Sequence, residues 1–207
     1  SGEPLLTIGV QFGAKNIKIN NKNFRIQIWD TNGHESFRSI TRSYYKNIAC
    51  FLVIYDISYR DSFNNVSSWI DECKSSSSKT SLFVLVGTKN DKNSERKVSY
   101  EEGRDLAEKY KIIFFETSAK NGNNVDEIFL NSSKIIAEKI DQGYYDLEDE
   151  SCGIKLGKKS YENNRENLRK KEKVKSVNLN SLVSKNINLN KNKNYEKFIY
   201  LSKYMNY

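Results

Sequence analysis

The sequence predicts an α/β fold, a doubly wound and mostly parallel sheet. Three short runs are almost wholly apolar: residues 49–55 (ACFLVIY), 82–87 (LFVLVG) and 112–115 (IIFF). Strands of this composition are buried on both faces, as in a parallel sheet that helices cover. Segments with helical spacing of apolar residues separate the runs. This alternation of strands and helices is typical of a doubly wound sheet, where ligands bind at the carboxyl ends of the strands.

Two further strands are predicted before the first apolar run, over residues 10–19 and 23–29. Both have strand-like composition, and the polar segment 18–24 (KINNKNF) provides a turn between them. We therefore expect them to pair as a β-hairpin.

Three helices are predicted between and after the apolar runs. The first covers residues 61–74, with a stripe of apolar residues facing inward. The second begins at Ser99, which forms a capping box with Glu102. The third covers residues 125–140, and Asn124 before it is a candidate N-cap.

The composition limits the classes of protein that are possible. The chain has 207 residues, 37% of them apolar, which fits one ordinary domain plus an extension. Three cysteines and one histidine have no metal-ligand or disulfide-framework spacing and indicate a reducing compartment. No apolar run approaches the roughly 18 to 20 residues that cross a bilayer, and we expect no secretory signal.

We place the domain boundary after residue 143. Residues 1–143 contain the predicted fold, and residues 144–207 form a basic tail rich in lysine and asparagine that we expect to be largely disordered. The tail has 14 Lys and Arg against 8 Asp and Glu, so it contributes +6 of the net charge of +8. Such a tail either contacts an anionic partner or is a solvated extension. Residues 195–207, which are rich in aromatics, favour a short amphipathic helix.

Polar clusters follow three of the predicted strands: residues 30–35 (DTNGHE), 88–91 (TKND) and 116–120 (ETSAK). Each cluster alone is also a common turn or cap. Together, in this order, they predict one rim that binds a purine nucleotide. The Asp91 carboxylate can accept two hydrogen bonds from guanine, and the Ala119 N–H can donate to its carbonyl oxygen.

The same rim offers groups for the rest of the nucleotide. The stems of Lys89 and Lys120 can lie over the plane of the base. On the phosphate side, Asp30 can hold a magnesium-bound water. The Gly33 N–H can reach a terminal phosphate because no side chain blocks the approach.

At these clusters the sequence resembles the Rab family of small GTPases. Residues 26–45 (IQIWDTNGHESFRSITRSYY) are similar to the family's second switch, and residues 7–12 (TIGVQF) to the end of its first. Residues 52–58 resemble its LVYDIT strand, and residues 116–120 match its ETSAK motif. Residues 36–45 (SFRSITRSYY) of the second switch and residues 152–157 (CGIKLG) resemble the Rab-two branch and its close relative, the Rab-four branch.

The resemblance implies a GTP-hydrolysing switch in vesicle transport on the cytosolic face of the ER and Golgi, with Mg²⁺ as cofactor. Thr7 would bind Mg²⁺ and sense the γ-phosphate, while Asp30 and Gly33 would act as described above. Expected partners are effectors, an exchange factor and a GTPase-activating protein. The guanine pocket would comprise Thr88, Lys89, Asp91, Ser118, Ala119 and Lys120. The effector-binding aromatic triad would be Phe12, Trp29 and Tyr44.

The sequence departs from the family in three places. It contains no glycine-rich P-loop ending in Gly-Lys-Ser or Gly-Lys-Thr, and it opens inside the first switch. We therefore expect the first strand, P-loop and first helix to be missing, which would leave two halves of a sheet with unpaired edges. His34 stands where the family has the glutamine that orients the attacking water, which predicts slow hydrolysis.

The third departure is at the other end, where no prenylation cysteine occurs, so only weak membrane contact is expected. Both departures at the ends lead us to expect an incomplete or mis-spliced Rab product. The alternative function is a remnant that binds partners through the triad without nucleotide. A module in which the tail binds RNA or membranes has little support, and no nucleic-acid partner is expected.

Overall fold

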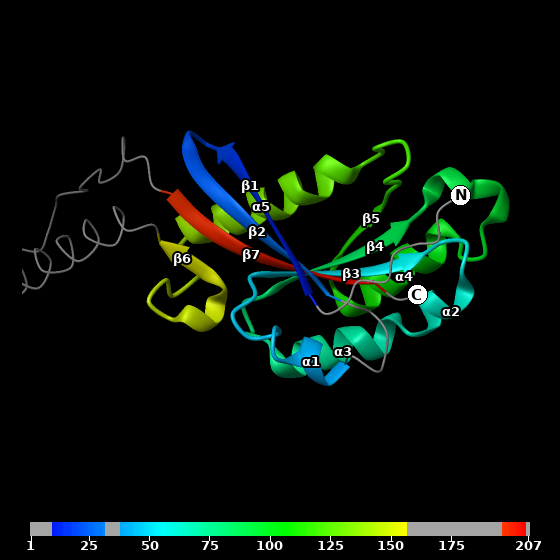
Figure 1. Cartoon of the computed structure of the whole chain (residues 1–207), viewed down its shortest axis with the longest axis horizontal. Coiled ribbons are helices and arrows are strands. Elements are labelled where there is room, and N and C mark those ends of the chain that lie inside the picture. The colour runs from blue at the N-terminus through cyan, green and yellow to red at the C-terminus, as the bar shows by residue number, and fades with distance from the viewer. Residues whose placement is uncertain (1–9, 32–37, 157–195, 206–207) are drawn as a thin grey trace, which may run out of the picture.

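The computed structural model describes residues 10–31, 38–156 and 196–205. Their strands form one sheet in the order β1-β2-β7-β3-β4-β5, with β6 paired to β7 (Figure 1). The strands are β1 (Val10–Ile19), β2 (Lys22–Thr31), β3 (Cys50–Asp56), β4 (Leu82–Thr88), β5 (Ile113–Glu116), β6 (Ile154–Leu156) and β7 (Glu196–Met205). The α-helices are α1 (Arg38–Arg42), α2 (Arg60–Asn64), α3 (Val66–Ser76), α4 (Tyr100–Tyr110) and α5 (Val125–Asp141). The predicted α/β class is confirmed.

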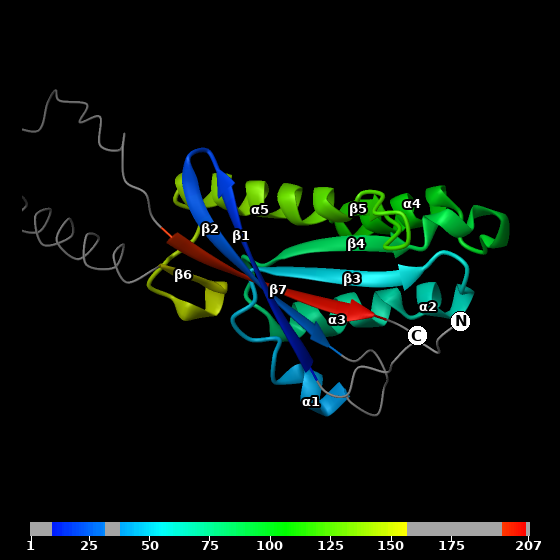
Figure 2. The same cartoon turned by 45° about the horizontal axis from the view of Figure 1, so that its top comes forward.

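The three apolar runs form the parallel strands β3, β4 and β5, as predicted. Helices cover both faces of this part of the sheet, with α5 on one side and α3 on the other (Figure 2). In β3, Leu52 and Ile54 pack toward the core that contains α5, whereas Phe51, Val53 and Tyr55 pack toward α3 and α4. This alternation explains why a strand buried on both faces is apolar along its length.

The predicted hairpin is also confirmed. β1 and β2 pair antiparallel over their full lengths, from Val10 opposite Thr31 to Ile19 opposite Lys22. The turn consists of Asn20 and Asn21, whose φ angles are 48° and 60°. Two consecutive residues with positive φ make the tight turn that matches strand twist, and asparagine tolerates this conformation better than most residues.

The helices follow the predictions with two differences. The capping box of α4 is formed, since the Glu102 N–H donates to Ser99 Oγ over 3.1 Å and the Ser99 N–H donates to Glu102 Oε2 over 2.9 Å. The helix predicted over residues 61–74 is divided into α2 and α3 at Asn65. Asn124 does not cap α5: its backbone is left-handed, and its amide instead donates to the Glu116 carbonyl over 2.9 Å.

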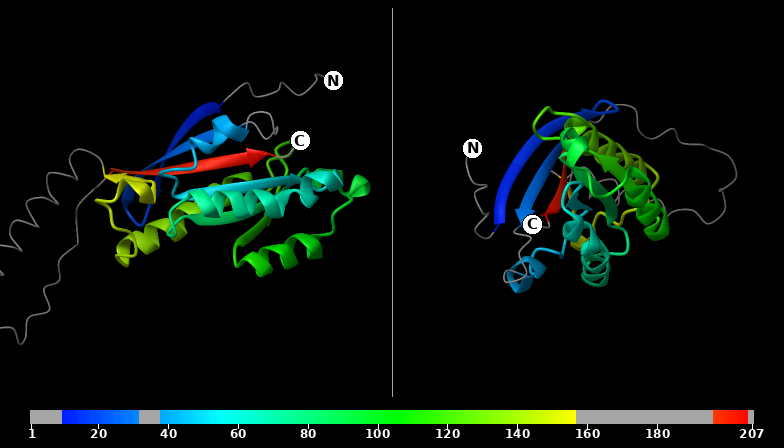
Figure 3. Two further views of the ribbon diagram at one scale, coloured as in Figure 1. Left: turned by 90° about the horizontal axis from the view of Figure 1, so that it is seen from below. Right: turned by 90° about the vertical axis from the view of Figure 1, so that its right-hand side faces the viewer.

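The C-terminal part of the chain differs most from the predictions. The prediction of an amphipathic helix over residues 195–207 is wrong, because Glu196–Met205 form strand β7. β7 lies between β2 and β3 and runs parallel to both (Figure 3). The prediction of two unpaired sheet edges is also wrong, because β7 pairs with both β2 and β3. The segment at residues 157–195 lies outside the described residues, and none of the described helices is long and apolar enough to span a membrane.

Tyr55 determines which residues fit at the interface between the sheet and α4. Its side chain is fully buried, and its hydroxyl oxygen would clash with a Cβ on Gly103. The Phe114 ring lies 2.5 Å from the same position. Both neighbours are rings in a packed core, which cannot move aside without disturbing other contacts. α4 can therefore approach the sheet this closely only with glycine at position 103.

This packing predicts that Gly103→Ala lowers the free energy of unfolding by about 1–3 kcal/mol through overpacking. The measurement is urea unfolding followed by circular dichroism. Gly13→Ala is the matched control, because nothing lies within 4 Å of the Cβ it would add. If the two variants unfold at the same urea concentration, the proposed clash does not exist.

Candidate functional site

The polar clusters after β4 and β5 lie side by side at one rim of the sheet. The two strands are parallel neighbours, with Gly87 paired to Glu116. The loops that follow them are joined by backbone bonds, since the Asn90 N–H donates to the Thr117 carbonyl over 3.0 Å and the Thr117 N–H to the Gly87 carbonyl over 2.8 Å. Residues 88–91 and 116–120 therefore form one continuous surface.

Asp91 is the central acidic group of this surface. Its Oδ1 accepts a short hydrogen bond from the Ser118 hydroxyl, and its Oδ2 lies 3.9 Å from the Lys120 ammonium. The hydrogen bond from Ser118 is the main reason that the pKa of the Asp91 carboxyl lies below its usual value. Asp91 is thus held as a carboxylate, a form that can only accept hydrogen bonds.

Ser118 positions the loop as well as the carboxylate. Its side chain is fully buried, and its hydroxyl oxygen accepts a hydrogen bond from the Lys120 N–H over 3.1 Å. This bond holds the turn that contains Ala119. Ala119 is exposed, although its neighbour Ser118 is buried. The Lys120 side chain is 83% exposed, so its stem is accessible to a flat ligand held by Asp91.

Lys89 has an acidic partner that the sequence analysis missed. Its ammonium lies 2.7 Å from Asp56 Oδ2, and its backbone is left-handed with φ of 62°. Asp56 also accepts hydrogen bonds from the N–H and hydroxyl of Ser58. Burial acts to raise the pKa of the Asp56 carboxyl, but the hydrogen bonds from Lys89 and Ser58 outweigh it and lower the pKa. Asp56 is the last residue of β3 and comes directly after the apolar run of residues 49–55, which is the signal that could have identified it.

Arg96 and Glu116 form a second contact that the sequence did not reveal. The two guanidinium nitrogens Nη1 and Nη2 donate to Glu116 Oε1 and Oε2 over 2.7 and 2.8 Å. Nη1 also donates to the Val98 carbonyl over 2.9 Å. The bidentate pair is mostly buried and connects the segment after Asp91 to the end of β5. It braces the two loops of the rim against each other.

The side chain of Thr88 makes a hydrogen bond within the protein. Its hydroxyl donates to the Tyr55 carbonyl over 2.8 Å, which ties the end of β4 to the end of β3. The Thr88 carbonyl in turn accepts from the Ile57 N–H over 3.1 Å. Thr88 therefore uses both its hydroxyl and its carbonyl to join the ends of β3 and β4 beside the predicted pocket.

Only part of the predicted phosphate side is described. Asp30 is half-buried near the carboxyl end of β2, where it pairs with Gln11 of β1 and Lys203 of β7. Thr7, Gly33 and His34 lie outside the described residues. In the described part of the chain, no group of three or more His, Cys, Asp or Glu side chains could hold a metal ion.

The three aromatic residues predicted to meet effectors are in contact. Trp29 lies between the other two, with ring centroids 5.0 Å from Phe12 and 5.6 Å from Tyr44. Phe12 is 53% exposed, while Trp29 packs partly against the core on the α3 side. The arrangement places an accessible aromatic surface across the hairpin and the segment after α1.

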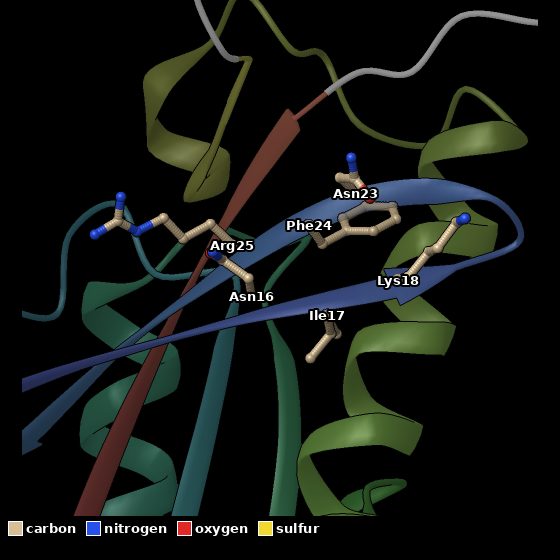
Figure 4. Close-up of a pocket in the computed structure, with 6 residues that line it drawn as sticks. All are labelled: Asn16, Ile17, Lys18, Asn23, Phe24 and Arg25. Carbon is tan, nitrogen blue, oxygen red and sulfur yellow. The ribbon is translucent and has the colours of Figure 1, made fainter.

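A separate pocket lies at the opposite end of the hairpin, beside the Asn20–Asn21 turn. Its lining residues are Asn16, Ile17, Lys18, Asn23, Phe24 and Arg25. Lys18 and Arg25 point in different directions, so they do not converge on one position (Figure 4). This pocket is at the amino end of β2, away from the rim.

In a comparison with protein-family models, the model of the Ras family matches residues 3–138. The matched segment covers more than half of the chain and includes both loops of the rim, the hairpin and all three residues of the aromatic contact.

The brace between the rim loops predicts that Arg96→Ala lowers the free energy of unfolding by about 1–3 kcal/mol, because Glu116 would keep its charge without its partner. Lys92→Ala is the control from the same segment. Lys92 pairs with Glu95 on the exposed surface, and losing such a pair changes stability by less than about 1 kcal/mol. Thermal unfolding of the two variants checks this, and equal melting temperatures would show that the brace contributes nothing.

Proposed function

The chain belongs to the Ras family of small GTPases, and from this membership we propose that it is a guanine-nucleotide switch of the Rab type. The family binds GTP and GDP with Mg²⁺ and hydrolyses GTP. The proposal for this chain is carried by one observation, the carboxylate of Asp91 held by Ser118 beside Lys120. We further propose, from likeness to the Rab-two branch, a role in vesicle transport between the ER and Golgi.

The residues of the rim support guanine over the other bases. Asp91 is fixed as an acceptor of two hydrogen bonds, which fits the N1–H and exocyclic amine of guanine, whereas adenine has no such pair of donors. The Ala119 N–H lies in the turn held by Ser118 and fits the guanine carbonyl oxygen. The stems of Lys89 and Lys120 would cover the two faces of the base.

Asp56 adds a restraint on one of these lysines. A lysine has four rotatable bonds and loses much conformational entropy when a ligand fixes it. Because the ion pair with Asp56 already holds the Lys89 ammonium, the stem is partly ordered before the base binds. Asp56 is therefore a positioning residue for Lys89.

When nucleotide and Mg²⁺ are bound, the terminal phosphate would supply the bond that is hydrolysed. Its charge, together with that of Mg²⁺, would order the switch loops. Of the residues proposed for that side, Asp30 would hold a magnesium water, Thr7 would bind the ion, and Gly33 would contact the terminal phosphate. The aromatic surface of Phe12, Trp29 and Tyr44 is where we expect effectors to dock.

The guanine assignment predicts a change of specificity in Asp91→Asn. Asparagine offers a donor where guanine also has a donor, so affinity for GDP should fall roughly tenfold to hundredfold. Xanthosine diphosphate has a carbonyl in place of the amine and should gain affinity. Competition against fluorescent GDP measures both. Asp105→Asn, on the exposed face of α4, is the control and should leave both affinities unchanged.

A direct titration with fluorescent GDP, with and without Mg²⁺, separates the proposal from its alternative. Tight binding that requires Mg²⁺ supports a working switch. Absence of binding in a folded chain would contradict it and favour a protein that engages partners through the aromatic surface without nucleotide.

A further inference from the structure

Glu72 of helix α3 contacts the chain on both sides of Tyr44, a residue of the aromatic surface. Glu72 Oε1 accepts a hydrogen bond from Arg42 Nε over 2.8 Å and another from the Tyr45 hydroxyl over 3.2 Å. Arg42 is the last residue of α1, and Tyr45 directly follows Tyr44. One carboxylate oxygen therefore holds the segment two residues before Tyr44 and one residue after it.

The surroundings of Glu72 favour both contacts. Its side chain is 10% exposed, although it carries a charged group. A carboxylate that is largely removed from water is unfavourable unless hydrogen-bond donors surround it. Arg42 and Tyr45 supply two such donors. Burial is the main reason that the pKa of Tyr45 is raised, so its hydroxyl keeps the proton that it donates to Glu72.

Helix α1 and the turn after it need an external support. α1 has five residues, and a helix this short is not stable through its own backbone bonds. In the turn, the Tyr44 N–H donates to the Thr41 carbonyl over 3.0 Å and the Tyr45 N–H to the Arg42 carbonyl over 3.2 Å. These bonds shape the turn but lie within the segment. The contacts with Glu72 connect it to α3, which lies beside α1 (Figure 1).

Helix α3 is itself fixed on two sides. Toward the core, its buried residues are Val66, Trp69, Ile70 and Cys73. Toward α4, the Tyr110 hydroxyl donates to Asp71 Oδ2 over 3.3 Å, and Lys74 Nζ donates to the Tyr110 carbonyl over 3.2 Å. A helix packed in this way moves little relative to the core. Glu72 therefore offers α1 a fixed point.

We propose that Glu72 is a positioning residue for Tyr44 and thereby holds the aromatic surface together. The ring centroid of Trp29 lies 5.6 Å from that of Tyr44 and 5.0 Å from that of Phe12. Phe12 and Trp29 belong to the hairpin, whereas Tyr44 belongs to the segment after α1. Two separate parts of the chain thus form the surface, and Glu72 fixes one of them. That the surface docks partners rests on the proposed function, but the position of Tyr44 does not.

Quenching of tryptophan fluorescence by iodide measures this position in the full chain. Of the two tryptophans, Trp69 is 3% exposed and out of reach of an ionic quencher, whereas Trp29 is half-buried against Tyr44. Tyr44→Ala removes the neighbouring ring and gives the quenching constant of an uncovered Trp29. Glu72→Met should produce most of this increase, because the methionine sulfur is only a weak acceptor. The fold should persist, since the Arg42 side chain is 59% exposed and its charge can return to water.

Matched variants isolate the cause. Glu72→Gln keeps an oxygen that can accept both hydrogen bonds and should be quenched like the original chain. Asp71→Asn changes the neighbouring carboxylate, which contacts Tyr110 rather than α1, and should also have no effect. Arg42→Ala removes one donor at an exposed position and should give a smaller increase than Glu72→Met. Adding Glu72→Met to Tyr44→Ala should give no further increase, because both act through one contact. Circular dichroism checks that each variant is folded.

Three results would overturn the proposal. One is quenching like that of the original chain in folded Glu72→Met, or in Arg42→Ala if the methionine variant does not fold. Another is an increase in Glu72→Gln or Asp71→Asn as large as that in Glu72→Met. The third is an additive effect in the double variant. The titration with GDP is read separately: a chain that binds no GDP but shows the expected quenching contradicts the proposed function and supports the role of Glu72.

Discussion

The sheet of this protein is continuous because one strand, β7, pairs on both of its edges. On one side it completes the ladder of β2, and on the other side that of β3. An unpaired backbone group in the middle of a core is unfavourable because it has lost water without gaining a partner. The pairing of β7 removes this penalty from two strands at once. The hairpin and the parallel strands therefore form one sheet.

The candidate site depends on this sheet for its alignment. Parallel strands bring their carboxyl ends to one rim. Contacts between the loops that follow the strands then fix the positions of these loops. Arg96 with Glu116 and Lys89 with Asp56 hold adjacent loops through charged groups, each partly removed from water. Such pairs contribute little to net stability when their desolvation is counted. Their effect is geometric, because they set where Asp91 and Ala119 stand relative to each other.

Sequence reasoning identified the parts of the fold that leave a local mark. β3, β4 and β5 were predictable because burial on both faces requires continuous apolar residues, and α4 because Ser99 and Glu102 cap it within three residues. β7 was not predictable, because its lysines break the apolar run that is typical of a central strand, and because its partner strands are distant in the sequence. For the site, Asp91 and Ser118 were found through their motifs. The partners Asp56 and Arg96 were not, because a contact between loops leaves no periodicity.

The position of β7 also links the two halves of the candidate site. Its carboxyl end reaches the rim, with Tyr204 beside Thr31 and Met205 beside Ile54, two residues before Asp56. Asp30, Phe12 and Trp29 lie on the hairpin side of this strand, and the loops of the rim, residues 88–91 and 116–120, lie on the other. Within the described sheet, a displacement of one half relative to the other must change the pairing of β7. Core packing against α5 resists separation of the halves but sets no strand register. β7 is therefore the element of the described sheet that connects the hairpin, with Phe12 and Trp29, to the strands that carry the loops of the rim.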